Sequence, residues 1–304
     1  METVMRNFFQ FLAKSKTING GAKRYGFKLG AHRFVAGETL DKAVLAVRKL
    51  NEEGKLATLD HLGEFVANEK EASLTTKACI HTLKAIAESG IQSNLSVKLT
   101  SLGLDLGKEI CLNNMRSILD VAQRLDIFVR IDMEDFSHCQ ITQDIFYELR
   151  QQYEKLGLVI QAYLYRSTDD IEALNTINAN LRLVKGAYKE SSEVAFPNKV
   201  DVDNQFLAII KQHLLNGNYT AIASHDVSII DEIKQFIKKH NISAEQYEFQ
   251  MLYGISEELQ KTLVKEGYRV RIYVPYGHDW FGYYMRRLAE RPANVWFVLK
   301  NMFK

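Results

Sequence analysis

Between residues 56 and 274 the chain alternates short apolar runs with polar turns and amphipathic stretches. Each apolar run is nearly continuous and often β-branched before it reaches a polar end, which is typical of parallel strands covered on both faces. Eight such runs predict eight strands, over residues 56–60, 95–100, 127–132, 158–163, 181–186, 219–225, 247–251 and 269–274.

The stretches between these runs have the spacing of amphipathic helices. One example is the series Ile229, Ile230, Ile233, Phe236 and Ile237, with apolar residues at i, i+1, i+4, i+7 and i+8. Parallel strands need such crossovers. Eight strand and helix units in about 250 residues predict a (β/α)8 barrel of the TIM type. A doubly wound sheet is disfavoured because neither GxGxxG nor GxxxxGK[ST] occurs.

Only three prolines occur and no low-complexity linker divides the chain. We therefore expect one catalytic barrel over residues 55–304, a helical arm over residues 1–54, and a final helix over the barrel mouth. The first helix of the arm carries apolar residues beside basic ones: Phe8, Phe9, Phe11 and Leu12 with Arg6, Lys14 and Lys16. This pattern suits a membrane surface, but packing on the barrel or on a partner subunit is the interpretation we favour.

Composition narrows the function classes. The 304 residues are 46% hydrophobic and 25% charged, typical of a globular protein with a large core. A net charge of +2 gives no reason to expect nucleic acid. Cys79, Cys111 and Cys139 form no CxxC pair, which disfavours disulfides and structural zinc and indicates a reducing, cytoplasmic compartment. No apolar run approaches the roughly 20 residues that span a bilayer.

Polar residues recur where the predicted strands end. In a TIM-type barrel the active site lies at the C-terminal ends of the strands. These ends carry Asp60-His61-Leu62-Gly63-Glu64, Lys98, Asp132-Met133-Glu134-Asp135, Gln161, Arg182 with Lys185, Ser224-His225-Asp226, Gln250 and Tyr273. Polar groups there cost desolvation energy unless they are partnered or solvated, so their recurrence indicates a site.

A second cluster lies in the segment YYMRRLAE, which Pro292 closes. Tyr283 lies one helical turn before Arg286 and Arg287, and Glu290 lies one turn after them, so all four can share a broad face. Two adjacent guanidinium groups match a carboxylate or a phosphate bidentately. A solvated surface helix with an Arg286 to Glu290 ion pair fits the same segment equally well.

Seven segments together resemble the proline dehydrogenase family: SVKLTSLG, RIDMED, QAYL, LRLVKGAY, EFQML, RIYVPYG and YYMRRLAERPAN. They cover every predicted strand from the second to the eighth except the sixth, where ASHD is a looser match. The chain ends soon after the barrel, so we expect the monofunctional form found in bacteria, without an aldehyde dehydrogenase domain.

The resemblance implies a fold, an activity and a cofactor. It implies flavin-dependent oxidation of L-proline to Δ1-pyrroline-5-carboxylate, with hydride transfer from proline C5 to N5 of FAD. Electrons would then pass to a membrane quinone or to oxygen. It is consistent with a cytoplasmic protein, peripheral at the inner face of the membrane if the arm binds lipid.

The resemblance also assigns substrate residues. Arg286 and Arg287 would bind the proline carboxylate with Lys98 as a third cation. Asp132 and Glu290 would balance these charges. The residues that would wall the ring are Tyr188, Tyr283 and Leu252. By the same resemblance, Glu64 can pair with Arg286 as a gate that closes the occupied site.

For the flavin, the resemblance places Arg182 near the N5 edge. The other residues that match flavin-contact positions are Met133, Gln161, Lys185, Gly186, Ala187, Ser224, His225 and Gln250. A cation and hydrogen-bond donors near the isoalloxazine favour its reduced, anionic form. Tyr273 matches a tyrosine that supports the site, so the catalytic residues we expect are Asp132, Arg182 and Tyr273.

Some of these residues also fit a purely structural role. Asp226 can cap the helix that follows it. Gly186 can serve only a tight turn, and Tyr188 can be a core aromatic. Three acids fit a solvated loop: Asp132, Glu134 and Asp135.

Three rival functions are weaker. A metal-dependent hydrolase is disfavoured because His61, His225 and His278 are dispersed, with no HxH or HExxH pair. A Schiff-base aldolase would use Lys98 or Lys185, but nothing nearby gives a reason for a neutral lysine. A scaffold is disfavoured because many polar groups converge at one barrel end.

Overall fold

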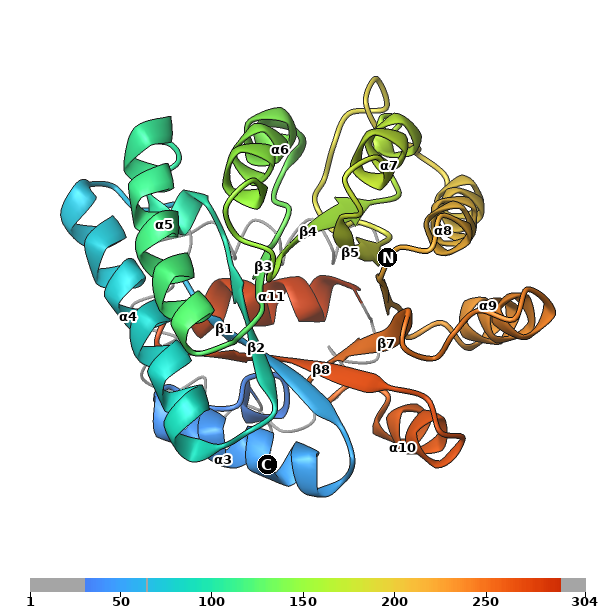
Figure 1. The fold of residues 1–304 in the computed structure, drawn as a ribbon, viewed down its shortest axis with the longest axis horizontal. Helices are drawn as coiled ribbons and strands as arrows, with labels where there is room; N and C mark the ends of the chain where they lie inside the picture. The colour runs from blue at the N-terminus through green and yellow to red at the C-terminus, as the bar shows by residue number, and fades with distance from the viewer. Residues whose placement is uncertain (1–30, 64, 291–304) are drawn as a thin grey trace.

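A computed structural model of the chain describes residues 31–63 and 65–290, except for the side chains of Arg286, Leu288, Ala289 and Glu290. Eight parallel strands close into a barrel in sequence order (Figure 1). They are β1 (Leu56–His61), β2 (Ser93–Val97), β3 (Val129–Ile131), β4 (Leu156–Gln161), β5 (Asn180–Val184), β6 (Thr220–Ala223), β7 (Tyr247–Leu252) and β8 (Val270–Tyr276). β8 pairs with β1 from Leu56↔Arg271 to His61↔Tyr276 and closes the ring. The predicted (β/α)8 barrel is confirmed.

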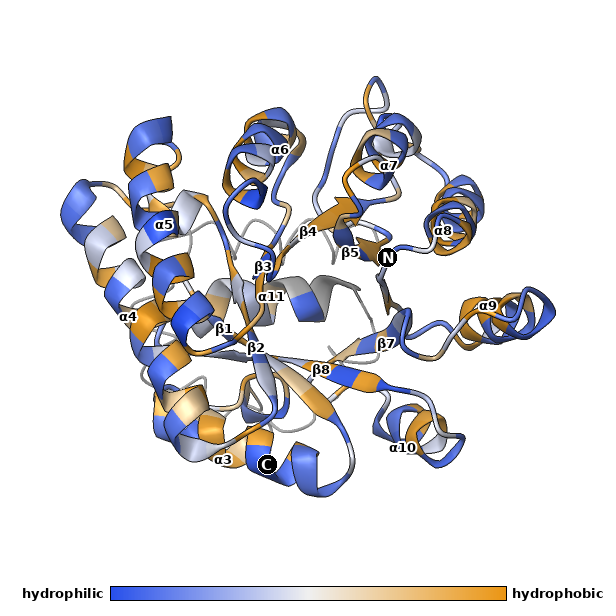
Figure 2. Cartoon of the chain, in the orientation of Figure 1, coloured by the Kyte–Doolittle hydropathy of each residue, from blue (hydrophilic) through white to orange (hydrophobic). Residues whose placement is uncertain are grey.

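Helices surround the strands (Figure 1). They are α3 (Leu40–Glu52), α4 (Glu69–Ser89), α5 (Lys108–Arg124), α6 (Phe136–Arg150), α7 (Ser167–Asn175), α8 (Lys199–Leu215), α9 (Val227–Lys239) and α10 (Glu257–Lys265). Figure 2 shows apolar and polar residues mixed along these helices. In α9 the predicted stripe buries Ile229, Ile230, Ile233 and Ile237, while Phe236 is half-buried against the same core. One apolar face of each helix thus covers the barrel.

The predicted strands match the observed ones, but several run past the true end. β2 ends at Val97, and Thr100 begins a short 3-10 helix, η3 (Thr100–Leu102). β5 ends at Val184 and β6 at Ala223, two residues before the predicted ends. The apolar pattern marks burial, and the loop residues that follow these strands are also partly buried, so the pattern alone does not fix the last ladder hydrogen bond.

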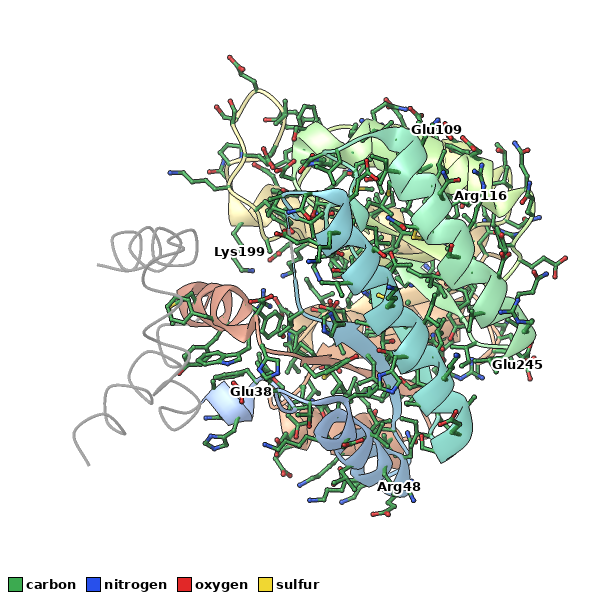
Figure 3. The ribbon with its side chains drawn as sticks, turned by 90° about the vertical axis from the view of Figure 1, so that its left-hand side faces the viewer. Glu38, Arg48, Glu109, Arg116, Lys199 and Glu245 are labelled. Atoms are coloured by element: carbon green, nitrogen blue, oxygen red, sulfur yellow. The ribbon has the colours of Figure 1, made fainter. Side chains whose placement is uncertain are left out.

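The last helix, α11 (Trp280–Glu290), lies at one end of the barrel (Figures 1 and 3). Its Trp280, Phe281 and Tyr284 are buried in a second apolar cluster with Leu62, which follows β1. Tyr273 of β8 and Leu252 at the end of β7 pack against the same cluster. The final helix therefore covers the C-terminal mouth, as the sequence predicts.

The N-terminal region is described only from residue 31. η2 (Ala31–Arg33) leads to Phe34 and Val35, which are buried in the same cluster as α11, and α3 packs against β1 and β8. The predicted face of Phe8, Phe9, Phe11 and Leu12 lies outside the described residues. The boundary at residue 54 stays a prediction. In the described part of the chain, no helix combines the length and the apolar character needed to span a membrane.

Candidate active site

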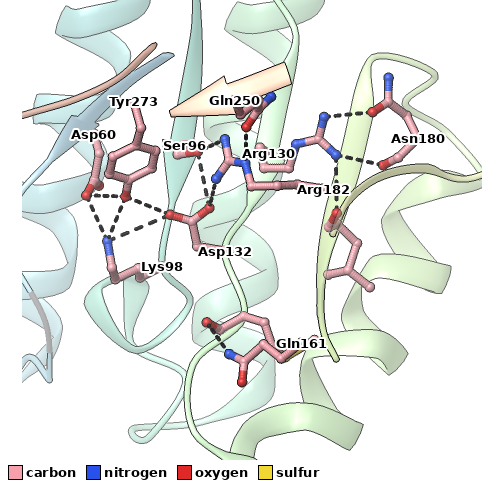
Figure 4. Close-up of polar contacts among 12 residues, drawn as sticks. Asp60, Ser96, Lys98, Arg130, Asp132, Gln161, Asn180, Arg182, Gln250 and Tyr273 are labelled. Atoms are coloured by element: carbon pink, nitrogen blue, oxygen red, sulfur yellow. Dashed lines mark hydrogen bonds and ion pairs between the residues drawn. The ribbon is translucent and has the colours of Figure 1, made fainter. Parts of the chain in front are cut away.

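Arg182 and Asp132 form a buried ion pair at the centre of the barrel mouth (Figure 4). Arg182 is on β5, and Asp132 follows directly on β3. Arg182 Nη1 lies 2.6 Å from Asp132 Oδ1, and the residues are 5% and 8% exposed. A desolvated guanidinium needs such a counter-charge, because its interaction with water has been lost. Asp132 is therefore no solvated loop acid.

Two further partners fix the orientation of Arg182. Its Nε donates to Gln250 Oε1 at 2.6 Å, and its Nη2 donates to Ser96 Oγ at 3.2 Å. Ser96 Oγ in turn donates to Asp132 Oδ1 at 3.2 Å. The guanidinium carbon lies 5.3 Å from the ring centroid of Tyr273, within cation–π range. A planar fork held by acceptors on different strands has little freedom to rotate.

Lys98 and Tyr273 link Asp132 to a second acid, Asp60. Lys98 Nζ lies 2.8 Å from Asp60 Oδ2 and 3.9 Å from Asp132 Oδ2. The Tyr273 hydroxyl lies 2.6 Å from Asp60 Oδ2 and 2.8 Å from Asp132 Oδ2. Burial, followed by the charges of Asp132 and Asp60, raises the pKa of Tyr273 well above its ordinary value. The phenol therefore stays protonated and donates.

The two cations Lys98 and Arg182 match the two carboxylates Asp60 and Asp132, so this quartet is formally neutral. Each charge is buried beside an opposite one. An anion bound here would therefore add a charge that these four residues leave unbalanced.

Gln161 lies at the end of β4, beside the loop that follows β3. Its Nε2 donates to the backbone oxygens of Met133, at 3.1 Å, and Glu134, at 2.9 Å. Its Oε1 is buried without a hydrogen-bond partner among the described residues. A buried acceptor in this condition costs free energy unless a donor reaches it. Gln161 thus offers one free acceptor at the mouth.

The acids after β3 differ in environment. Glu134 is buried and accepts from Thr100 N at 3.0 Å and Thr100 Oγ1 at 2.5 Å, so its interpretation as a solvated acid is wrong. Asp135 is half-exposed and lies 2.7 Å from His138 Nδ1. Glu134 therefore holds the loop after β2 against the loop after β3.

The segment Lys185-Gly186-Ala187 follows β5. Lys185 Nζ lies 2.5 Å from Asp203 Oδ1 and 3.1 Å from Asp226 Oδ2. Gly186 has φ +110°, and a Cβ built there would lie 2.1 Å from Cδ1 of Tyr163. Only glycine fits this position, because of both its backbone and its neighbour.

Asp226 occupies the N-cap position of α9, but its side chain makes no capping hydrogen bond to the backbone. It accepts instead from Ser228 Oγ at 2.7 Å and from Lys185. The Ser228 hydrogen bond and then Lys185 lower its pKa to about 2, although burial opposes them. Asp226 thus binds Lys185 and the Ser228 hydroxyl in the first turn of α9, but its side chain caps no backbone N–H.

The remaining predicted residues surround the same mouth. His225 Nε2 lies 2.9 Å from the backbone nitrogen of Leu252 and accepts from it. Ser224 Oγ accepts from the Asp226 backbone N–H at 3.1 Å. Tyr283 on α11 is buried, and the Arg287 guanidinium carbon lies 5.1 Å from its ring centroid.

Tyr188 is half-buried and packs against the main core. This agrees with the alternative interpretation of Tyr188 as a core aromatic. The side chains of Arg286 and Glu290, and all of Glu64, lie outside the described residues. The proposed Glu64 to Arg286 gate is therefore not described. Within the described part of the chain, no group of three or more His, Cys, Asp or Glu residues is arranged to hold a metal ion.

Sequence reasoning placed Asp60 among the polar strand ends but gave it no role, and it left Ser96 out. Asp60 ends an apolar strand, and Ser96 lies two residues before Lys98, so both carry a signal. Residues two apart in an extended segment point to the same side, which places Ser96 with Lys98 inside the barrel.

Comparisons with known proteins give one family. The sequence model described as proline dehydrogenase matches residues 43–300. Proline dehydrogenase 1 of Bacillus subtilis (strain 168) is 55% identical over 301 residues, covering 99% of this chain and 100% of its own. Proline dehydrogenase of Deinococcus radiodurans is 43% identical over 279 residues, which cover 90% of each chain.

Solved structures show the same likeness. Proline utilization A (PutA) from Bdellovibrio bacteriovorus, inactivated by N-propargylglycine, superposes with a TM-score of 0.82 at 30% identity. The match covers 89% of this chain and 33% of the PutA chain, so this chain corresponds to about a third of that protein.

Proposed function

Because this chain belongs to the proline dehydrogenase family, we propose that it oxidises L-proline to Δ1-pyrroline-5-carboxylate with a bound FAD. The observation that carries the proposal is the fixed, buried guanidinium of Arg182 at the barrel mouth, bound by Asp132, Gln250 and Ser96. Hydrogen-bond donors held in a fixed orientation in a desolvated site stabilise negative charge that develops during a reaction, even where an ion pair such as Arg182 with Asp132 is neutral as a whole. This is the environment that a reduced flavin favours.

The residues present fit a flavin. Gln161 Oε1 is a buried acceptor without a partner among the described residues, and the imide N–H of an isoalloxazine is a donor of the matching kind. When bound, FAD would supply a two-electron hydride acceptor. The residues that would hold it are Met133, Gln161, Arg182, Lys185, Gly186, Ala187, Ser224, His225 and Gln250.

Charge balance supports the assignment of the substrate carboxylate to α11. Lys98 and Arg182 already have carboxylate partners in Asp60 and Asp132. Additional cations are therefore needed to bind an anion, and Arg287, with the adjacent Arg286, is on the helix that covers the mouth. Bidentate guanidinium groups suit a carboxylate. Glu290 would limit the surplus positive charge.

The ring of proline would lie against apolar side chains. Tyr283 is buried on α11, and Leu252 packs against the same cluster. Tyr188 would complete the wall from the loop after β5. Trp280 and Tyr284 are buried above the mouth and would keep water from the reacting carbon. Asp132 and Tyr273 would hold this arrangement through their hydrogen bond.

We assign a membrane quinone as the electron acceptor, with residues 1–17 as a candidate contact to lipid or to a second subunit. Glu64 would gate the occupied site by pairing with Arg286. The quinone and the gate are assigned by sequence resemblance, and the contact of residues 1–17 by the basic amphipathic pattern of the arm.

An absorption spectrum tests the proposed function. The purified protein should be yellow, and its flavin absorbance should bleach when L-proline is added without oxygen. L-valine, which has no ring, is the control and should leave the spectrum unchanged. A colourless preparation that gains no proline oxidation after incubation with FAD would contradict the proposal.

A further inference from the structure

Below the mouth, the barrel interior holds another buried ion pair, Glu248 with Arg271. They are on the neighbouring strands β7 and β8 and are 1% and 9% exposed. Arg271 Nε lies 2.8 Å from Glu248 Oε1, and Arg271 Nη1 donates to the Ala57 carbonyl at 2.8 Å. The proposed function assigns this pair no role.

Gln250 connects this pair to Arg182. Its Nε2 donates to Glu248 Oε1 at 2.5 Å, and its Oε1 accepts from Arg182 Nε at 2.6 Å. Glu248 and Gln250 are two residues apart on β7, so both point to the same side of the strand. The result is one series of hydrogen bonds: Arg271, Glu248, Gln250, Arg182 and Asp132.

The two residues on either side of Gln250, Arg182 and Glu248, determine which way its amide group points. An arginine Nε–H only donates, and an ionised carboxylate only accepts. Burial acts to raise the pKa of Glu248, but the charge and hydrogen bond of Arg271 outweigh it and lower that pKa, so the carboxylate stays ionised. One orientation of the Gln250 amide therefore satisfies both neighbours. In the reversed orientation, the Gln250 NH2 would face the Arg182 Nε–H, a donor against a donor. Its oxygen would face the Glu248 carboxylate, an acceptor against an acceptor.

We propose that Glu248 is a positioning residue for Arg182: it fixes the Gln250 amide so that its oxygen holds the Arg182 Nε–H. The consequence for proline oxidation rests on the proposed function, whereas the hydrogen-bond order itself does not. Glu248 reaches Arg182 through Gln250, because its own hydrogen bonds go to Gln250, Arg271 and Tyr219.

Two variants test the order of donors and acceptors. In E248L, the oxygen that accepts from both Arg271 Nε–H and Gln250 Nε2 is lost, so position 248 no longer holds the Gln250 amide in one orientation. In E248Q, the amide oxygen can take the place of Glu248 Oε1 and accept from both donors, so the Gln250 amide should keep its orientation.

The first readout does not depend on proline or FAD. In protein labelled with 15N-arginine, the Nε–H resonance of Arg182, assigned with Arg182→Lys, should move upfield and exchange faster with water in E248L. E248Q should keep it in a downfield, protected position. E245Q is the matched control, because Glu245 is exposed on the side of the molecule away from α11 (Figure 3).

The second readout is turnover. In E248L, kcat with L-proline should fall about tenfold, equivalent to about 1.4 kcal/mol, while KM changes less, and E248Q should keep most of the wild-type kcat. An unchanged Arg182 resonance in E248L, or an E248Q variant no better than E248L, overturns the proposal. Wild-type protein that fails to oxidise proline while the resonances behave as expected contradicts the proposed function alone.

A measurement on the wild-type chain covers the case in which the variants do not fold. The side-chain NH2 protons of Gln250 should show nuclear Overhauser contacts to the Glu248 methylene protons. Contacts to the Arg182 Nε proton instead would mean a reversed amide and would overturn the proposal.

Discussion

The ammonium nitrogen of Lys98 lies 2.8 Å from Oδ2 of Asp60, and the two residues are 9% and 1% exposed. Water cannot replace either partner at this depth. Removal of one charge therefore leaves the other buried with weaker compensation, here Asp132 at 3.9 Å from Lys98. Asp60 should thus matter to stability as well as to the site.

We predict that Asp60→Asn lowers the free energy of unfolding by about 3 kcal/mol or more, as expected when a buried pair loses one partner. Urea unfolding measures this loss. The control is Glu232→Gln, since Glu232 pairs with Lys211 at 2.6 Å on the surface. That change should cost no more than about 1 kcal/mol. Equal effects of the two changes would show that the Asp60 pair contributes no more than a surface pair.

Arg182→Lys keeps the charge but loses the planar fork. A lysine cannot donate at once along the three directions now taken by Asp132, Gln250 and Ser96. We expect kcat with L-proline to fall about 100-fold or more, the scale for loss of a preorganised electrostatic group. Arg116→Lys, at a surface pair with Glu148, should keep wild-type kcat. Wild-type turnover by Arg182→Lys would show that charge alone suffices.

The barrel could be predicted because parallel strands covered on both faces must be apolar throughout. The eight runs are therefore visible before any pairing is known. The strand ends were less accurate, because burial continues into loops such as the one that begins at Lys98. The motif residues Asp132, Arg182 and Tyr273 do come together at one end of the barrel.

The partners of these residues could not be predicted in the same way. Lys98 and Asp60 are 38 residues apart, and Arg182 and Ser96 are 86 apart. Contacts across a barrel join strands far apart in the chain, and one sequence gives no record of which side chains meet. Only the register of β1 against β2, with Asp60 opposite Ser96, shows that Asp60 faces Lys98.

Arg287→Met should weaken proline binding. Its guanidinium lies over the ring of Tyr283, and the proposed function gives it the substrate carboxylate. Loss of a charge-assisted hydrogen bond worth about 1.5–3 kcal/mol should raise KM for proline by about ten- to 150-fold. The flavin absorbance of the purified variant should be unchanged. A wild-type KM would remove Arg287 from the substrate site.

His213 should make the protein less stable in acid. It is fully buried, and burial lowers its pKa from 6.5 to about 4. Between these values the unfolded chain binds a proton that the folded chain does not, so stability falls as pH falls. A pKa difference of this size corresponds to about 3 kcal/mol between pH 7 and pH 4. His213→Gln should lose less stability over this range than the wild type, as measured by urea unfolding.

His138 should give the opposite pH dependence of stability. Burial opposes its protonation, but hydrogen bonds to Asp105 and Asp135 outweigh burial and raise its pKa. Its stabilising contribution is present below its unfolded pKa and disappears as pH rises through the folded value. His138→Gln should therefore destabilise the protein at pH 5 more than at pH 8. The same pH trend in both histidine variants would contradict these assignments.

Gly186→Ala should disturb the cofactor segment specifically. A Cβ at Gly186 would lie 2.1 Å from the Tyr163 ring and would also strain a backbone with φ +110°. Gly217→Ala is the matched control, because Gly217 has φ +80° but nothing within 4 Å of its added Cβ. The control should cost only backbone strain of about 1–2 kcal/mol. Gly186→Ala should cost more than this in urea unfolding.

Gly186→Ala should also raise the dissociation constant for FAD by about tenfold or more, because relief of the collision must move Lys185 and Ala187 on either side. Titration of apoprotein with FAD, followed by flavin fluorescence, measures this change, and Gly217→Ala should bind FAD like the wild type. Equal FAD affinities in the two variants would show that the backbone after β5 does not hold the cofactor, even if Gly186→Ala is the less stable protein.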